Sequence, residues 1–467
     1  MALLRSVVRM PLVHLDDTIV ALSTPPGRGG IAVVRLSGPE ARHIAAPLLR
    51  LRHPLEAGHA IFGELIDESS GERIDEVVAT FFERPHSYTT EDIVEISAHG
   101  SPVVLEYIVE RALARGARLA EPGEFTMRGF LHGRIDLTQA EAVQDLIESQ
   151  TLFQAKIAAQ QLEGALSRRI QPVKKQLVDL IALLEAGIDF AEDDVAVLPD
   201  DRILAAISQV RPPLETLAQS FAYGRVVHEG LTLALIGRPN VGKSSLFNRL
   251  VERERAIVTP VPGTTRDLVS ETVSIAGIPI RLIDTAGIRA GADQVEAIGI
   301  RKSYEALADA DIVLVITDDT SSQHADEDER LLNATSGRKR ILVRNKSDLG
   351  RNADQSSFGS DHLPQVSTSA VTGEGIEALR ERVVVEVGGS SAVQQESGFL
   401  TNLRQRKLIE ESLSALSAAE EAVRNRTPHE MLLMDLYNSL RPLDSITGET
   451  TTDDILNLIF STFCIGK

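Results

Sequence analysis

The chain has 467 residues, of which 43% are hydrophobic, and a formal net charge of -19 at pH 7. This length exceeds one ordinary hydrophobic core, so about two to four domains are expected, and the acidic balance argues against tight non-specific binding to nucleic acid. An RNA partner would have to be held by a local basic patch or by another protein. The single cysteine, Cys464, excludes an intrachain disulfide and any multi-cysteine metal site.

The first residues, 1–16, are predicted to be an extension outside the folded part. Arg5 and Arg9 lie among apolar residues there, and no acidic residue precedes Asp16. A transit peptide would be longer and richer in Ser and Arg, and a secretory signal would not have its apolar region divided by charge. A disordered extension, or a true start at Met10, is therefore expected. No apolar run approaches the roughly eighteen residues of a membrane span, so we expect a cytoplasmic protein.

Residues 17–133 are predicted to form an α+β domain. Expected strands lie at residues 18–22, 31–36, 76–82 and 93–96, with helices at 39–46 and 103–114. Arg35 and Glu95 interrupt apolar strand runs, and the alternation of a strand could turn both side chains to water. A functional role and simple solvation are equally compatible with that pattern.

Two helical blocks flank the middle of the chain. The first follows residue 137, with Pro172 expected just inside a helix start, and the second begins near Phe399. Neither block has enough apolar faces to close a core alone, so we expect them to pack on each other. The predicted domains are thus residues 134–228 and 391–467 for the two helical halves, with residues 229–390 inserted between them.

The inserted segment opens with a phosphate-binding loop. Gly-Arg-Pro-Asn-Val-Gly-Lys-Ser at residues 237–244 lies between an expected strand and an expected helix. The glycines let backbone N–H groups point at phosphate oxygens, Lys243 supplies a cation, and the Ser244 hydroxyl can complete a Mg²⁺ shell. The helix N-terminus adds the positive end of its dipole.

Three further motifs follow expected strands, as in a doubly wound α/β sheet. They are Asp-Thr-Ala-Gly at 284–287, Asn-Lys-Ser-Asp at 345–348 and Ser-Ala at 369–370. Asp284 can hold Mg²⁺ through water, and Asp348 is suited to accept the two N–H groups of a guanine edge. These motifs in this order predict a domain that hydrolyses guanine nucleotides.

With these motifs the sequence resembles the TrmE-Era-EngA-like class of GTPases, and within it the MnmE (TrmE) family of tRNA modification GTPases. The signatures are Thr-Pro-Pro-Gly-Arg-Gly-Gly at 24–30, Pro-Gly-Glu-Phe at 122–125, the inserted G domain, and Phe-Cys-Ile-Gly-Lys at 463–467. The resemblance implies a tetrahydrofolate-binding, homodimerising N-terminal domain, a helical domain and an inserted G domain.

The resemblance also implies partners and a reaction. An MnmG-like FAD protein would join the homodimer in a heterotetramer or larger complex. Using GTP, Mg²⁺, K⁺ and a 5-formyl or 5,10-methylene tetrahydrofolate, the complex would add an aminomethyl or carboxymethylaminomethyl group to C5 of uridine 34 in certain tRNAs.

Most implied site residues belong to the G domain. Ras-like enzymes use a Gln after the Asp-x-x-Gly motif to orient water, but this chain has Ile288, so the resemblance assigns that role to Glu296. A solvated helix carboxylate is the alternative for Glu296. The predicted nucleotide-binding residues are Asn240, Val241, Gly242, Lys243, Ser244, Ser245, Thr259, Thr264, Thr265, Asp284, Thr285, Ala286, Gly287, Asn345, Lys346, Asp348, Ser369 and Ala370. Implied metal ligands are Ser244 and Thr265 for Mg²⁺, and Asn240, Thr259, Val261 and Thr264 for K⁺.

The resemblance assigns the folate to Arg35, Glu95, Arg134 and Lys467. One member of the family carries Lys where this chain has Arg134, so a planar guanidinium takes the place of a compact ammonium. Cys464 is either a functional thiol or a small side chain in an apolar niche. Because the resemblance places the folate near Arg35 and Glu95 and also assigns Lys467 to it, we expect the chain end to fold back onto the N-terminal domain, either within one chain or across the dimer.

Two other functions share parts of this pattern. A ribosome-assembly GTPase would carry the same nucleotide motifs but also a basic RNA-binding module, which this acidic chain does not show. A folate-dependent aminomethyltransferase with a regulatory G domain would share the N-terminal half.

Overall fold

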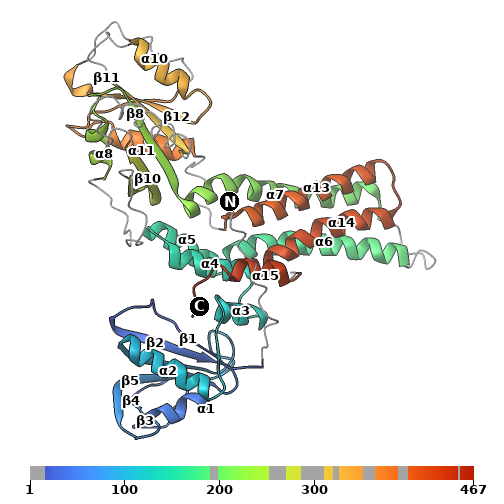
Figure 1. Ribbon diagram of the computed structural model, residues 1–467. Helices are drawn as coiled ribbons and strands as arrows, with labels where there is room; N and C mark the ends of the chain where they lie inside the picture. Colours follow the sequence, from blue (N-terminus) through green and yellow to red (C-terminus); the bar gives the residue numbers. More distant parts are fainter. Residues whose placement is uncertain are drawn as a thin grey trace, which may run out of the picture. The chain divides into compact units, whose positions relative to one another are not determined.

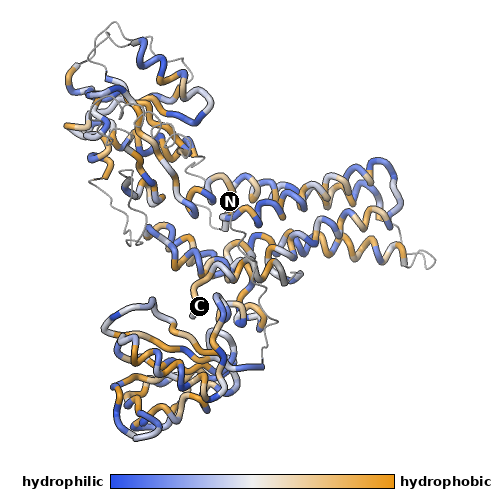
Figure 2. The backbone as a smooth tube through the Cα atoms, in the orientation of Figure 1, coloured by the Kyte–Doolittle hydropathy of each residue, from blue (hydrophilic) through white to orange (hydrophobic). Residues whose placement is uncertain are grey.

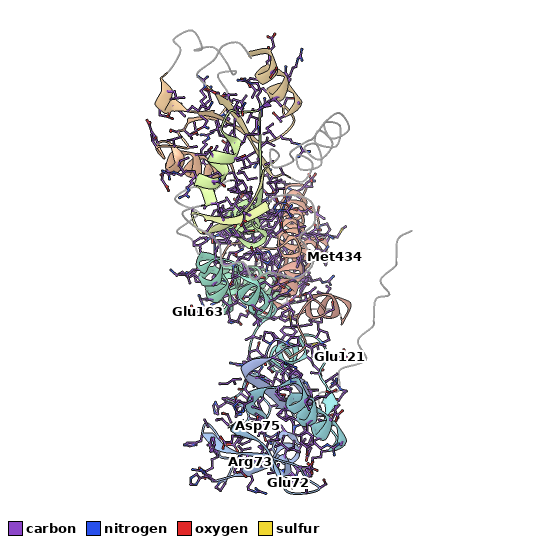
Figure 3. The ribbon with its side chains drawn as sticks, turned by 60° about the vertical axis from the view of Figure 1, so that its left-hand side comes forward. Glu72, Arg73, Asp75, Glu121, Glu163 and Met434 are labelled. Carbon is purple, nitrogen blue, oxygen red and sulfur yellow. The ribbon has the colours of Figure 1, made fainter. Side chains whose placement is uncertain are left out.

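The computed structural model describes residues 16–189, 198–251, 270–284, 310–318, 325–350, 363–387, 398–450 and 453–466 (Figure 1). The chain divides into two compact units, one of residues 1–144 with 444–467 and the other of residues 145–443. None of the described helices is both long and apolar enough to cross a bilayer. Charged side chains such as Arg73 and Glu163 lie exposed at the surface (Figure 3).

The first unit is built on a mainly antiparallel sheet. Its described strands follow the order β3-β4-β5-β6-β2-β1-β7, and only β1 and β7 pair in parallel. They are β1 (Ile19–Leu22), β2 (Gly29–Ser37), β3 (Leu49–Leu51), β4 (Ala60–Ile66), β5 (Arg73–Phe82), β6 (Ile93–Gly100) and β7 (Arg118–Leu119). The helices of the unit include α1 (Ala41–Ala45), η1 (Ala46–Leu48), α2 (Pro102–Ala114), α3 (Glu124–Leu131) and α15 (Asp453–Phe460).

Along β2 and β6, successive side chains lie on opposite faces of the sheet. One face carries core residues of this unit, and the other carries predicted site residues. Val34 and Leu36 pair with Ile96 and Val94, and all four are buried in one cluster with α2. Arg35, between the two buried β2 residues, therefore lies on the opposite face of the sheet, directly across from Glu95. The predicted α+β character and the four predicted strands are confirmed.

The second unit combines helices with a second sheet. Figure 1 shows α6, α7, α13 and α14 side by side, and the Tyr437 hydroxyl of α14 donates to Oε1 of Glu185 on α6 at 2.7 Å. The two helical blocks thus pack on each other, as predicted. The helices are α4 (Leu137–Glu148), α5 (Leu152–Leu162), α6 (Ala165–Asp189), α7 (Asp200–Glu229), α13 (Leu403–Arg424) and α14 (His429–Thr447), of which the end of α14 and most of α4 belong to the first unit.

One helix start was predicted wrongly. Pro172 lies inside α6, which begins at Ala165. Leu166 and Ile170 extend the buried face upstream of the proline, and this burial outweighs the lost backbone hydrogen bond.

The sheet of the second unit is parallel except for one edge. Its order is β13-β12-β11-β8-β10-β9, with β9 antiparallel to β10. The strands are β8 (Leu231–Gly237), β9 (Ser270–Ile275), β10 (Ile278–Asp284), β11 (Ile312–Asp318), β12 (Arg340–Asn345) and β13 (Gln365–Ser367), with helices α8 (Lys243–Val251), η3 (Ser347–Leu349), α10 (Ala325–Ala334) and α11 (Ile376–Glu386).

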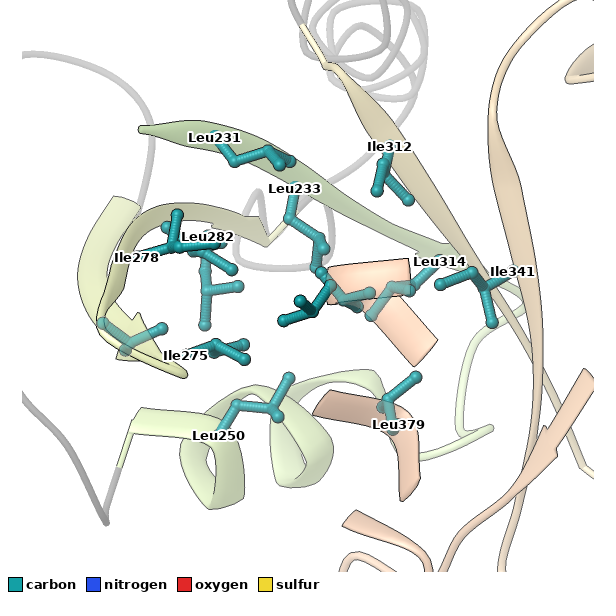
Figure 4. Packing of buried hydrophobic residues seen from close by; sticks show 14 of the residues in the cluster. Leu231, Leu233, Leu250, Ile275, Ile278, Leu282, Ile312, Leu314, Ile341 and Leu379 are labelled. Atoms are coloured by element: carbon teal, nitrogen blue, oxygen red, sulfur yellow. The ribbon is translucent and has the colours of Figure 1, made fainter. Parts of the chain in front are cut away.

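Both faces of this sheet are covered, as expected of a doubly wound fold. Leu233 and Leu282 pack with Leu250 of α8 and Leu379 of α11 on one face (Figure 4). Ala234 and Ile236 of β8 belong to a second buried cluster with Leu332 of α10. The strands are accordingly the most hydrophobic part of this region (Figure 2). The predicted P-loop α/β class is confirmed.

Candidate active site and ligand pocket

The phosphate-binding loop joins β8 to α8, as the motif predicted. Asn240 and Gly242 have φ values of 64° and 94°, and α8 begins at Lys243. A Cβ atom on Gly242 would lie 2.3 Å from Nδ2 of Asn345, so this position requires glycine on both conformational and steric grounds. Ser244 and Ser245 are exposed in the first turn of α8.

Lys243 and Asn345 hold the loop in shape. The Lys243 ammonium donates to the carbonyls of Gly237 and Arg238, each at 2.7 Å. Asn345 donates through Nδ2 to the Val241 carbonyl at 2.9 Å, while its Oδ1 accepts from the Ala370 N–H at 3.2 Å. One buried amide therefore ties together three of the four sequence motifs.

The guanine-reading motifs meet at the ends of β12 and β13. The Ser369 hydroxyl donates to Oδ1 of Asp348 at 2.5 Å, which orients that carboxylate. Lys346, with a φ of 65°, donates to Asp318 at the end of β11, also at 2.5 Å. Charge-assisted bonds of this kind fix side chains in a single geometry.

The phosphate-binding loop is also anchored to α10 by an ion pair that the sequence did not indicate. Arg238 donates through Nε and Nη2 to the two carboxylate oxygens of Asp328 on α10, at 2.6 and 2.9 Å. Their side chains are only 8% and 10% exposed. The two residues are 90 positions apart in the chain, so no local motif could have revealed the pair.

Part of the predicted G-domain site lies outside the described residues. β10 ends at Asp284 and brings that position to the same edge of the sheet as β8. The residues outside the description are Thr259, Val261, Thr264, Thr265, Thr285, Ala286, Gly287 and Glu296. Among the residues that are described, no group of three or more His, Cys, Asp or Glu side chains could hold a metal ion.

In the first unit, three of the four predicted folate residues gather around one tyrosine. Arg35 binds Glu95 through Nε and Nη2, at 2.8 and 2.6 Å. The guanidinium carbons of Arg35 and Arg134 lie 5.7 and 5.1 Å from the ring centroid of Tyr88, and Arg134 also donates to the Tyr88 carbonyl. Burial raises the pKa of the Tyr88 hydroxyl, so that group stays protonated at neutral pH. The sequence analysis missed Tyr88, because an isolated aromatic residue in a loop gives no signal.

A buried ion network lies beside this cluster of residues around Tyr88. Phe125 of the Pro-Gly-Glu-Phe signature lies under Arg35, with 5.5 Å from its ring centroid to the guanidinium carbon. The next-door Glu124, fully buried, accepts from Arg118 and Arg128, and Arg128 also binds Asp17. Burial alone would raise the pKa of Asp17, but the two arginines outweigh it and hold that pKa below its usual value. The signature glutamate therefore has a structural role.

The chain end docks on the same unit. Pro122 and Ile465 form an antiparallel bridge, and Ser23 donates to the Gly466 carbonyl at 3.2 Å. Gly466 has a φ of 97°, and a Cβ there would lie 2.3 Å from the Leu22 carbonyl oxygen. Phe463 is buried, whereas Cys464 is exposed and does not fill an apolar niche. Lys467 lies outside the described residues.

Comparisons with known proteins cover almost the whole chain. Residues 18–134 match the family described as the GTP-binding protein TrmE N-terminus, and residues 137–464 match the MnmE helical domain. The chain is 64% identical over 457 residues to the tRNA modification GTPase MnmE of Koribacter versatilis, which covers 97% of this chain and 100% of the relative. It is 41% identical over 454 residues to the protein of that name from Aquifex aeolicus, with the same two coverages of 97% and 100%.

Two solved structures are similar to a smaller part of the chain. The G domain of the T. maritima FeoB iron transporter is 31% identical, covering 33% of this chain and 98% of that chain, with a TM-score of 0.26. Aquifex aeolicus Era bound to GDP·AlF4⁻ is 26% identical, covering 41% of this chain and 66% of that chain, with a TM-score of 0.28.

Proposed function

Because the chain belongs to the MnmE family of tRNA modification GTPases, we propose that it couples GTP hydrolysis to the modification of C5 of uridine 34 in certain tRNAs. The group added would be aminomethyl or carboxymethylaminomethyl. The GTP-dependent part of this proposal is supported by two hydrogen bonds of the Asn345 side chain. They connect Val241 in the phosphate loop to Ala370, which is predicted to bind guanine. Binding of phosphate at the loop would therefore restrict the position of Ala370, and binding of the base would restrict the loop.

Guanine specificity rests on Asp348. Its carboxylate is oriented by the Ser369 hydroxyl at 2.5 Å and so presents a fixed acceptor to the two N–H groups of the base. Adenine has no such pair of donors on the corresponding edge. Lys243 would hold the phosphates, and Ser244 and Thr265, together with Asp284 acting through water, would hold the Mg²⁺ ion.

Hydrolysis would depend on K⁺ and Glu296. Ile288 stands where Ras-like enzymes have a water-orienting Gln, so another group must supply that function. A K⁺ ion held by Asn240, Thr259, Val261 and Thr264 would offset charge that develops between the β- and γ-phosphates. Removing an electrostatic element of this kind costs on the order of a hundredfold in turnover, and equal rates in Na⁺ and K⁺ would contradict this part of the proposal.

The cluster at Tyr88 suits a tetrahydrofolate derivative in its 5-formyl or 5,10-methylene form. Glu95 supplies a carboxylate acceptor for ring N–H groups, and its two bonds to Arg35 hold it in place. Arg134 and Lys467 would provide cations for the glutamate tail. The docked chain end supports this placement, since Gly466 contacts Leu22 on the strand beside Arg35. The exposed Cys464 thiol would be available for chemistry at the same place.

Assembly and location complete the proposal. The chain would act in the cytoplasm as a homodimer joined through residues 17–133, bound to an MnmG-like FAD protein in a heterotetramer or larger complex. The helical halves at 134–228 and 391–467 would carry the G domain of residues 229–390. Since the whole chain carries a charge of -19, the flavoprotein would supply much of the attraction for tRNA.

Mass analysis of wobble uridines tests the proposal. A strain lacking its own family member should accumulate unmodified uridine 34, and expression of this chain should restore the modification. Unchanged uridine together with a ribosome-assembly defect would favour the ribosome-assembly function. Unchanged uridine with a defect in one-carbon transfer would favour an aminomethyltransferase.

A further inference from the structure

The turn between β9 and β10 is held by the start of α5. Ala276 and Gly277 form a two-residue hairpin turn with φ values of 51° and 83°. The Thr151 hydroxyl donates to the Gly277 carbonyl at 2.5 Å. A Cβ on Gly277 would lie 2.4 Å from Cβ of Phe153, so the backbone of the turn is packed directly against that side chain. Phe153 in turn packs on the core under the second sheet.

The same helix start holds the end of α7. Gln154 donates through Nε2 to the carbonyls of Val227 and His228, at 2.8 and 3.0 Å. Its Oε1 accepts from the Thr151 N–H at 3.2 Å, which completes a capping box on α5. Gln154 is buried, and both ends of its amide are satisfied. Breaking one contact of this network therefore exposes an unpaired buried group.

The position of the β9–β10 hairpin relative to the nucleotide motifs suggests that these contacts also transmit movement. β10 ends at Asp284, the first residue of the Asp-x-x-Gly motif, and β9 begins a few residues after Thr265. The two stretches predicted to contact the nucleotide, 259–265 and 284–287, are thus connected in the chain to the start of β9 and the end of β10. The turn at the other end of the hairpin is held by α5. β9 and β10 are hydrogen-bonded to each other along almost their whole length. A displacement of the strands at the open end of the hairpin would therefore also displace the turn at Gly277.

A cavity beside these contacts provides room for movement. It has a volume of about 230 Å³ and is lined by α4, α5 and the end of α7, including Asp145, Gln154 and His228. Close-packed interiors resist displacement, and a void of this size removes that resistance on one side of α5.

We propose that Thr151, Phe153 and Gln154 form a coupling clamp through which the nucleotide state of the G domain positions α5 and α7. In one state the clamp holds the turn and the α7 end together, and in the other the hairpin shifts and releases α5 towards the cavity. This inference rests on the proposed GTPase function and adds the residues that connect hydrolysis to the helical domain. These are positioning residues, because none of them touches the nucleotide motifs.

Amide hydrogen exchange of the full chain tests the clamp directly. In the wild type, exchange in α5 and in the last turn of α7 should differ between the GDP and GDP·AlF4⁻ states. In Gly277→Ala, exchange in these segments should be the same in both states. Gly71→Ala is the matched control, since Gly71 lies between β4 and β5 with a φ of 72° and no atom within 4 Å of an added Cβ. No dependence on nucleotide in the wild type would overturn the proposal.

A second pair of variants guards against simple misfolding. Thr151→Val removes the donor to Gly277, whereas Thr151→Ser keeps it. The valine variant should retain nucleotide affinity and intrinsic GTP hydrolysis but lose tRNA modification by roughly 5- to 150-fold, the usual range of coupling between sites. The serine variant should modify tRNA normally. Equal modification by both variants would contradict the clamp, while absence of modification by the wild type would count only against the proposed function.

Discussion

At the scale of single residues, Asp348 is the side chain on which we propose that nucleotide choice depends. Asp348→Asn replaces an acceptor by a group that also donates, so it should clash with the guanine N–H donors and accept xanthine, which presents a carbonyl there. Binding titrations should show loss of GTP affinity and gain of affinity for xanthosine triphosphate. Unchanged GTP affinity would remove Asp348 from the site.

The buried Arg238–Asp328 ion pair is expected to contribute to the stability of the second sheet. Asp328→Ala leaves the buried Arg238 guanidinium without its two charged bonds, which typically destabilises a protein by about 3–5 kcal/mol. The effect should be read from exchange of β8 and β11 amides in denaturant, because a multidomain chain need not unfold in one step. Glu329→Ala, an exposed neighbour on α10, should change little. Equal effects of the two substitutions would show that the pair is not the anchor.

His228 gives the end of α7 a pH dependence. The hydrogen bond to Asp145 raises its pKa, burial opposes that rise, and the charges of Glu229 and Glu148 add to it. A pKa raised above the unfolded value means that the stabilisation is complete below about pH 6.5 and is lost as pH rises through the folded pKa. Exchange in the last turn of α7 should therefore be slower at pH 6 than at pH 8 after correction for intrinsic rates. His228→Gln should abolish this difference.

At the scale of elements, the chain end gives the sharpest test of the proposed folate site. Gly466→Ala places a Cβ 2.3 Å from the Leu22 carbonyl oxygen and so should displace the tail. Gly116→Ala is the control, because its φ of 100° imposes similar strain without a contact within 4 Å. The Gly466 variant and deletion of residues 463–467 should weaken folate binding and reduce tRNA modification while intrinsic GTP hydrolysis persists. Normal modification after the deletion would make the tail a packing element only.

The elements also show what local pattern can predict. Alternation of apolar residues predicted β1, β2, β5 and β6, and the motif glycines predicted the strand-loop-helix unit around Lys243. The strands β3, β4 and β7 were missed. β3 and β7 are very short edge strands, and in β4 Gly63 interrupts the apolar pattern of the sequence. Tyr88, the Arg238–Asp328 pair and the contact of Phe153 with Gly277 depend on packing between distant segments. Such contacts have no local signature in one sequence.

At the scale of the whole molecule, one chain carries two proposed ligand sites and a proposed mechanical link. The guanine-binding edge lies on the second sheet, the cluster at Tyr88 lies on the first, and the clamp at Thr151 links the second sheet to the helices of its own unit. Family membership makes the chain a GTPase of tRNA modification, and the clamp offers a route by which hydrolysis would act on the helical domain.

The most direct test is reconstitution of the reaction from purified components. The full chain, the proposed MnmG-like FAD protein, unmodified tRNA and a tetrahydrofolate donor would be incubated with GTP or with a non-hydrolysable GTP analogue, and uridine 34 would be analysed by mass spectrometry. The account predicts C5 modification with GTP and little or none with the analogue. Equal modification in both reactions would contradict the claim that this chain couples GTP hydrolysis to the chemistry on tRNA.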